Sequence, residues 1–174
     1  VIAKAATCKE AGVKTYTCTG CGETKTETIA KTAHTYATNV TTTKATLKAN
    51  GKIVTTKKCS VCGAVASINT TTIAYPKTIS LSKTVFTYNG KVQKPTVKVV
   101  GSDGKTISAS NYTVSYSNKN SKNVGQYTVT ITFKGNYSGT KKLTYKINPK
   151  GTSLKKLTAG SKQFKATWNK NTTQ

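Results

Sequence analysis

The chain has 174 residues, which is enough for one ordinary domain or two small ones. It carries 28 basic residues, all of them lysine, against four carboxylates, and its formal net charge is +24. With one histidine and four scattered carboxylates it offers few of the acids, bases and nucleophiles that catalysis requires, so the composition argues against an enzyme.

The polar residues favour strands over helices. Threonine dominates them, and its branched Cβ suits the half-buried surface of a sheet. The first ten residues lack the hydrophobic region of a signal peptide, and no stretch approaches the roughly 20 apolar residues that cross a bilayer. We therefore expect an all-β chain with no membrane span, either cytosolic or the mature piece of an exported protein.

Residues 1–75 hold all five cysteines and the single histidine, and they contain an internal repeat. The segment ATCKEAGVKTYTCTGCG at 6–22 aligns with ATLKANGKIVTTKKCSVCG at 45–63, which has two additional residues. In this alignment Leu47 stands where the first copy has Cys8. The pattern predicts two small zinc-ribbon-like β repeats, residues 1–36 and 37–75.

Each repeat contains the sequence Cys-x-x-Cys-Gly, whose spacing lets both thiolates bind one metal ion. Two ligand sets are compatible with the sequence. The first is an all-thiolate site made of Cys18, Cys21, Cys59 and Cys62. The second lies within the first repeat and is made of Cys8, Cys18, Cys21 and His34. The predicted ion is Zn²⁺ in a structural role, because four protein ligands leave no position for water.

The second pair is short of partners, since Leu47 replaces the counterpart of Cys8. Cys59 and Cys62 would have to borrow ligands from the first repeat or from His34. Disulfides are the main alternative to zinc, because an exported chain meets oxidising conditions. Five cysteines would then leave at least one thiol unpaired, and free thiols are the third alternative.

Residues 76–149 form short alternating runs separated by turn signals, a pattern typical of an antiparallel sandwich of six or seven strands. The best run covers 124–133, where four large residues alternate with threonines. The predicted inward-facing residues are Val85, Val97, Val99, Tyr112, Val114, Tyr116, Tyr127, Val129, Ile131, Phe133, Leu143, Tyr145 and Ile147.

The segment Asn148-Pro149-Lys150-Gly151 is typical of a linker, and residues 150–174 continue with Phe164, Ala166 and Trp168 in strand alternation. One or two strands cannot bury a core alone. We therefore expect these residues to be the start of a third module that continues in a longer polypeptide.

Several short motifs in the sandwich region suggest a family. They are Tyr88-Asn89-Gly90-Lys91, Lys94-Pro95, Asn111-Tyr112-Thr113-Val114, Asn123-Val124-Gly125 and Gly135-Asn136-Tyr137-Ser138-Gly139. This region resembles the Ig-like β-sandwich repeats of secreted and surface-anchored multidomain proteins in Gram-positive anaerobes of the clostridial group. The segment from Gly151 to Trp168 resembles the opening of a fibronectin-III-like domain, and the cysteine repeats resemble tandem segments of the same proteins. The resemblance implies an extracellular or cell-wall-associated stalk, spacer or adhesion module.

The lysines allow two interpretations. They are either solvated faces that protect strand edges, or a means of adhesion to anionic cell-wall polymers or host glycans. Nucleic acid is a less favoured partner, because the chain has no arginine. We expect a non-catalytic structural or adhesive segment whose partners are the neighbouring modules of the same polypeptide. The alternatives are a nucleic-acid-binding zinc protein and a carbohydrate-binding module, for which the candidate surface aromatics are Tyr36, Tyr88 and Tyr137.

Overall fold

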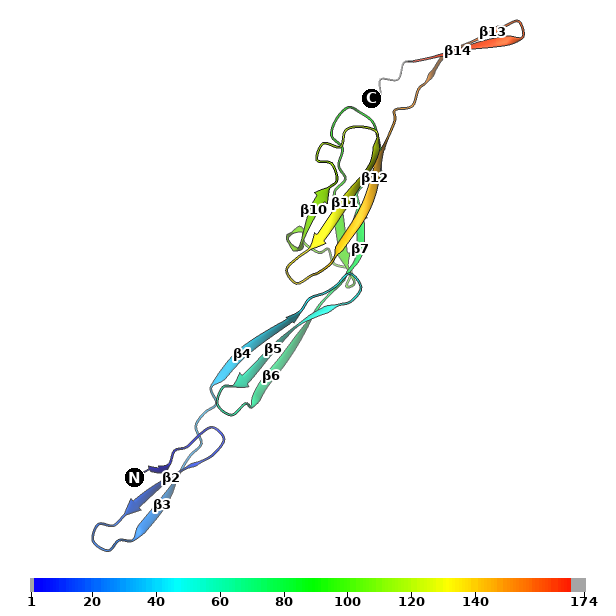
Figure 1. Cartoon of the computed structure of the whole chain (residues 1–174). Coiled ribbons are helices and arrows are strands. Elements are labelled where there is room, and N and C mark those ends of the chain that lie inside the picture. The colour runs from blue at the N-terminus through cyan, green and yellow to red at the C-terminus, as the bar shows by residue number, and fades with distance from the viewer. Residues whose placement is uncertain (1, 170–174) are drawn as a thin grey trace. The chain divides into compact units, whose positions relative to one another are not determined.

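The computed structural model describes residues 2–169, which form fourteen strands and one short 3₁₀ turn, η1 (Ala109–Asn111) (Figure 1). The all-β prediction is confirmed. The chain divides into two compact units, each described here by itself. The repeat unit comprises Val1–Thr43 and Lys52–Thr72, and the second unit comprises Lys44–Gly51 and Ile73–Gln174. Within the described range, no helix has the length and hydropathy needed to cross a membrane.

The repeat unit contains two three-stranded sheets, one from each sequence repeat. The first has the order β1 (Ile2–Lys4), β2 (Gly12–Thr17), β3 (Thr24–Ile29). The second has the order β4 (Tyr36–Thr43), β5 (Gly51–Cys59), β6 (Val65–Ile73), which lie side by side in Figure 1. Sequence neighbours pair antiparallel, from Gly12 opposite Ile29 in the first sheet to Tyr36 opposite Cys59 in the second.

These sheets bury very little apolar surface. Every residue of β4 is exposed, and in β3 only Ile29 is half-buried. Among the residues of the repeat unit whose burial is described, Cys59 is the one buried hydrophobic side chain, at 2% exposure. Hydrocarbon burial therefore contributes little to the stability of this unit, and another interaction has to hold it together.

The two repeats share the same turn ahead of their central strand. In the first, the Thr7 hydroxyl accepts hydrogen bonds from the backbone N–H groups of Lys9 and Glu10, at 3.2 and 3.0 Å. In the second, the Thr46 hydroxyl accepts from the two equivalent N–H groups, at 3.3 and 3.1 Å. The residue after each threonine, Cys8 or Leu47, thus occupies the same position in the same local structure.

Residues 76–149 of the second unit form two sheets. The smaller pairs β7 (Pro76–Leu81) antiparallel with β9 (Val97–Gly101). The larger has the order β10 (Tyr112–Tyr116), β11 (Gly125–Phe133), β12 (Thr140–Asn148), β8 (Val85–Thr87). Residues 76–149 thus contain six strands, as the turn spacing predicts.

One pairing differs from the antiparallel prediction. Strand β8 runs parallel to β12, with Val85 opposite Lys146. Strand β8 follows β7 of the small sheet but joins the edge of the large sheet. Because β8 and β12 are not joined by a hairpin turn, the connection does not force them to pair antiparallel. This register turns Phe86 toward the core and leaves Val85 41% exposed, so the prediction of an inward-facing Val85 is wrong.

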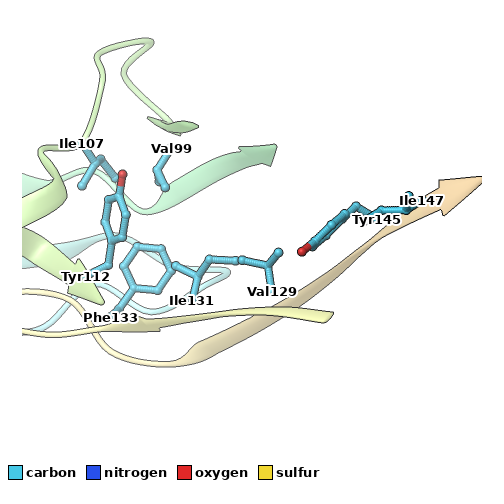
Figure 2. Close-up of a cluster of buried hydrophobic side chains, with 8 residues drawn as sticks. All are labelled: Val99, Ile107, Tyr112, Val129, Ile131, Phe133, Tyr145 and Ile147. Carbon is cyan, nitrogen blue, oxygen red and sulfur yellow. The ribbon is translucent and has the colours of Figure 1, made fainter. Parts of the chain in front are cut away.

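The core between these sheets is built from apolar side chains (Figure 2). It also includes one buried hydroxyl network. The Tyr145 hydroxyl donates to Ser121 Oγ at 2.7 Å, and Ser121 donates to the carbonyl of Gln93 at 3.0 Å. The alternation predicted for residues 124–133 is confirmed, whereas Val114 on the edge strand β10 is exposed. The buried members of the core are Val99, Ile107, Tyr112, Val129, Ile131, Phe133, Tyr145 and Ile147.

The loop 44–51 of the second repeat belongs to the second unit. The Ala45 N–H donates to the carbonyl of Asn136, and the Ala45 carbonyl accepts from the N–H of Ser138, both at 2.9 Å. Leu47 packs against the apolar core. It also lies so close to Gly139 that a Cβ atom on residue 139 would be 2.9 Å from Leu47 Cγ. This loop therefore adds a side chain to the core of the second unit.

Residues 154–168 form a hairpin of β13 (Leu154–Gly160) and β14 (Gln163–Trp168). The alternation of Phe164, Ala166 and Trp168 predicts a strand, and these residues lie in β14. Phe164 is 73% exposed and Trp168 61%, so within the described range these rings have no core to enter. The end of the predicted third module, residues 170–174, lies outside the described residues.

We expect Ile131→Ala to destabilise the second unit by about 2–5 kcal/mol, because Ile131 is fully buried and its truncation leaves a cavity. Urea unfolding followed through backbone amide signals of β11 and β12 measures the loss. Thr132→Ala, on the exposed face of the same strand, is the matched control and should change stability by less than about 1 kcal/mol. Equal losses in the two variants would contradict the assigned orientation of β11.

Candidate metal centre

The turn after β5 presents the second Cys-x-x-Cys pair. The Cys59 N–H donates to the carbonyl of Ala64 at 2.7 Å, and the Gly63 N–H donates to the carbonyl of Cys59 at 3.0 Å. Gly63 has φ +77°, a conformation that side chains disfavour and glycine adopts freely. The tight turn places Cys59 and Cys62 at one end of β5 and turns backbone N–H groups toward the Cys59 sulfur.

The start of β4 brings the histidine to this pair. Tyr36 pairs with Cys59 across the sheet, and the Ser60 N–H and hydroxyl both donate to the carbonyl of Thr35, at 3.0 and 3.2 Å. His34 is the next residue back along the chain, and its Nδ1 lies 3.3 Å from Cys62 Sγ. The strand register and the Ser60 bonds therefore set the position of the imidazole.

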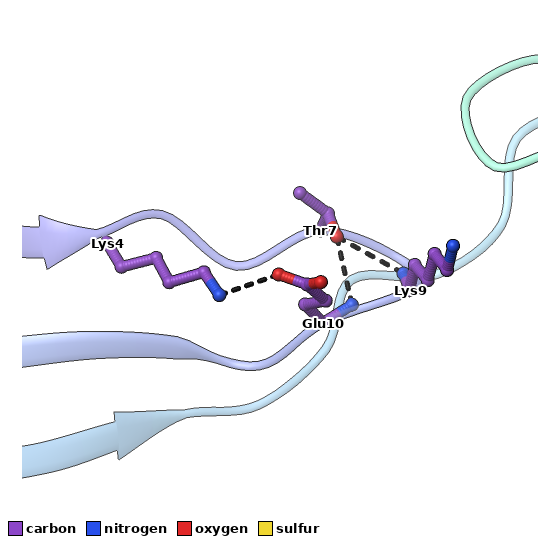
Figure 3. Close-up of polar contacts among 4 residues, drawn as sticks. All are labelled: Lys4, Thr7, Lys9 and Glu10. Carbon is purple, nitrogen blue, oxygen red and sulfur yellow. Dashed lines mark hydrogen bonds and ion pairs between the residues drawn. The ribbon is translucent and has the colours of Figure 1, made fainter.

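The fourth donor, Cys8, comes from the turn of the first repeat. The Thr7 hydrogen bonds stabilise this turn, and an exposed ion pair of 2.6 Å joins Lys4 to Glu10 beside it (Figure 3). Gly12 follows this turn. The backbone of Ala6 passes so close to Gly12 that a Cβ atom on residue 12 would lie 2.5 Å from the N atom of Ala6. In this arrangement Cys8 Sγ reaches within 3.7 Å of Cys59 Sγ.

The four donor atoms of Cys8, His34, Cys59 and Cys62 all lie within 4.8 Å of one another. Bond lengths of about 2.3 Å to sulfur and 2.0–2.1 Å to nitrogen place the donors of a tetrahedral zinc about 3.8 Å apart for two sulfurs and about 3.6 Å for sulfur and nitrogen. The observed distances of 3.7 and 3.3 Å are close to these values. A disulfide needs about 2.05 Å, and all five cysteines are free thiols. The cluster suits a four-coordinate metal ion.

This donor set is neither of the two that the spacing predicts. It takes Cys8 and His34 from the first repeat and Cys59 and Cys62 from the second. Cys18 and Cys21, the members common to both predicted sets, are exposed in the turn between β2 and β3 and lie outside the cluster. The sequence signal for the observed set is the loss of the second copy's cysteine at Leu47, which leaves Cys59 and Cys62 dependent on the first repeat.

The surroundings of the cluster set the protonation of its sulfurs in opposite directions. The N–H of Cys62, the His34 side chain and the N–H of Val61 lower the pKa of Cys59 to about 5. Burial and hydrogen bonding to the thiols of Cys62 and Cys59 raise the pKa of Cys8 to about 11. In the metal-free cluster the lowered pKa of Cys59 favours its thiolate and the raised pKa of Cys8 favours its protonated thiol, which would lose its proton on binding a metal ion.

Comparison of the chain with protein-family models, with curated proteins and with solved structures gave no match.

We expect metal affinity to rise with pH between about pH 6 and 8, because Cys8 must lose its proton on binding whereas Cys59 has already lost its own. Cys8→Ser should weaken binding and lower the slope of log affinity against pH by about one, because about one proton fewer is released on binding. Cys59→Ser should weaken binding but leave that dependence nearly unchanged. Competition with a chromophoric chelator at several pH values measures both, and an equal loss of slope in the two variants would contradict the assignment.

Proposed function

We propose that this chain is a non-catalytic structural and adhesive segment of a bacterial cell-surface or secreted multidomain protein. Its repeat unit is held together by one structural Zn²⁺, bound by Cys8, His34, Cys59 and Cys62. The observation that carries the proposal is the gathering of four soft donors from both repeats, at separations that suit tetrahedral zinc.

The energetics of the repeat unit support a structural metal. Its sheets bury almost no hydrocarbon, and Cys59, the buried member of the cluster, belongs to the donor set. A metal bound by donors far apart in the chain, such as Cys8 and Cys62, stabilises the folded form because the unfolded chain does not hold those donors together. Zinc binding here would supply the stability that a core supplies elsewhere.

The same donor set argues against catalysis. A catalytic zinc has three protein ligands and keeps one position for water or substrate, whereas four protein ligands fill the tetrahedron. The two thiols of the described range whose pKa values are shifted most, Cys59 and Cys8, are both donors of this site. These properties support a non-enzymatic role.

The second unit supports a spacer or stalk module. The two sheets of residues 76–149 and the core that they share support the Ig-like resemblance of this region, in which Gly90 and Gly135 form turns with φ of +74° and +66°. The uncovered rings of Phe164 and Trp168 agree with the opening of a fibronectin-III-like module. Modules of this kind suit an extracellular or cell-wall-associated location.

An adhesive role has one specific site in its favour. A hollow of about 390 Å³ on the second unit is lined by Lys48, Lys77 and Lys141 together with Leu47, Pro76, Thr78 and Ile79. Three lysines that line one hollow would attract a polyanion such as an anionic cell-wall polymer or host glycan. The hollow contains no carboxylate that would neutralise them.

The alternatives have less support. A carbohydrate-binding module needs exposed aromatic platforms, but Tyr88 and Tyr137 pack against the core, and Tyr36 alone of the three is exposed. Tyr36 lies beside the His34 ring at 5.6 Å between centroids and faces the Lys57 ammonium, so it is part of the metal-centre surroundings. A nucleic-acid-binding zinc protein would concentrate arginine near the cysteines, and the chain has none.

Zinc analysis of protein purified without chelator tests the structural role. We expect one Zn²⁺ per chain. Its removal should lower the hydrogen-exchange protection of β4, β5 and β6 by about 100-fold when the reference sample holds free zinc at 100 times Kd. Strands β10, β11 and β12 should keep their protection, because their core is apolar and contains no cysteine.

The matched variants are Cys62→Ser, in the cluster, and Cys21→Ser, at the equivalent position of the first repeat. Only the first should lose zinc and lower the protection of β4, β5 and β6. A metal-free native protein that contains two disulfides would overturn the proposed zinc.

Adhesion is tested by binding to a phosphodiester cell-wall polymer over a range of salt concentrations. Replacing Lys48, Lys77 and Lys141 by alanine should lower the slope of log affinity against log salt by about two to three. The control removes the same charge from exposed lysines outside the hollow, Lys91, Lys119 and Lys122. Equal effects in the two triple variants would contradict a localised site and would support a diffuse charge effect.

A further inference from the structure

The metal centre is shared between consecutive repeats rather than contained in one. The earlier repeat contributes a cysteine from its Thr turn and a histidine from the segment after its sheet, and the later repeat contributes its Cys-x-x-Cys pair. In this arrangement Cys8 and His34 form the donor half, and Cys59 and Cys62 form the thiolate half.

The first repeat carries a second thiolate half with the same geometry. The Cys18 N–H donates to the carbonyl of Glu23 at 2.8 Å, and the Gly22 N–H donates to the carbonyl of Cys18 at 3.0 Å. The corresponding bonds around Cys59 are 2.7 and 3.0 Å. Gly22 has φ +76°, against +77° for its counterpart Gly63. The Cys21 N–H also points at Cys18 Sγ, at 3.4 Å.

What this second pair lacks is a donor half. Cys18 and Cys21 are exposed, whereas Cys59 is buried and Cys62 half-buried in the cluster. Beside Cys18 lies an open hollow of about 340 Å³, which is lined by Tyr16, Thr17, Cys18, Glu23, Thr24 and Lys25. The pair therefore has the turn of a metal centre and open space next to it.

The missing half cannot come from the second repeat. That repeat has Leu47 in place of a donor cysteine, and the only histidine of the chain, His34, already faces Cys62. Its Thr turn belongs to the second unit, where Leu47 packs against the core. A donor half for Cys18 and Cys21 has to be presented by another repeat that contains both residue types.

We propose that Cys18 and Cys21 are the thiolate half of a second zinc centre, which a further repeat of the same kind completes by presenting its own counterparts of Cys8 and His34. The inference rests on the proposed zinc centre. Each such metal would join two successive repeats, and a row of repeats would form a chain of sheets with one zinc at each junction. Repeat two, which has no donor half, would end that row and pass to an apolar module through Leu47.

The test lengthens the chain by one repeat. Ala6 aligns with Ala45, so the repeat offset is 45 − 6 = 39 residues. Fusing a second copy of residues 1–39 ahead of Val1 places a donor half before Cys18 at the spacing that Cys8 and His34 have before Cys59, apart from the two additional residues. In the copy, Cys18 and Cys21 are replaced by serine, so that it supplies donors alone.

We expect the original chain to bind one Zn²⁺ or Co²⁺ and the lengthened chain to bind two, each with the visible spectrum of tetrahedral Co²⁺. In the zinc-loaded original chain two thiols should react rapidly with a thiol reagent, and in the loaded lengthened chain those two should be protected. The control is the same lengthened chain with Cys8→Ser and His34→Ala in the copy, which should bind one ion and leave the two thiols reactive.

Three results would overturn parts of the proposal separately. An original chain that binds no metal removes the proposed zinc centre itself. One ion in both chains, with the first centre intact, removes only the second centre. Two ions bound by the original chain, with dimerisation that Cys18→Ser abolishes, would show that the pair is completed by a second copy and not by a further repeat.

Discussion

Cys59 is the one described residue of the repeat unit that combines burial with a hydrophobic side chain, and its sulfur belongs to the cluster of four donors. The six strands around it expose most of their threonines and lysines to water, so backbone pairing has little hydrocarbon to support it. Isolated sheets of this size are marginal in water without a covered apolar face. The geometry of the unit therefore depends on how the chain gathers three sulfurs and one imidazole.

That gathering is a property of turns. The glycine at φ +77° forms the Cys-x-x-Cys turn, the Ser60 bonds to the carbonyl of Thr35 fix the approach of His34, and the Thr7 turn aims Cys8. The hydrogen bonds of the Cys-x-x-Cys turn and of the Thr7 turn join residues a few positions apart, whereas the bonds from Ser60 to Thr35 join residues distant in the chain. Two long-range contacts then connect the repeats, His34 Nδ1 to Cys62 Sγ at 3.3 Å and Cys8 Sγ to Cys59 Sγ at 3.7 Å.

The Thr turn is used twice with different chemistry. Its backbone bonds are the same in both repeats, yet the next side chain is a thiol in one case and a leucine in the other. Cys8 extends to donors of the second repeat, while Leu47 enters the core of the second unit. The local geometry that the two repeats share can therefore serve either a metal centre or an apolar interior, depending on a single side chain.

The sequence determined the local features of this protein. Residue types within a few positions of one another indicate the alternation of β11, the strand content and the Cys-x-x-Cys turns. The two repeats are evident from the alignment of residues 6–22 with 45–63. The tertiary structure decided which distant elements meet. Strand β8 pairs parallel to β12, and Phe86 rather than Val85 faces the core. The sequence does not reveal this orientation, because in a strand of three residues the alternation is too short to show which side is buried. The tertiary structure also joined Cys8 and His34 to Cys59 and Cys62 and left Cys18 and Cys21 outside. Spacing fixes which ligands can share a turn, but only the packing of two sheets fixes which turns come together.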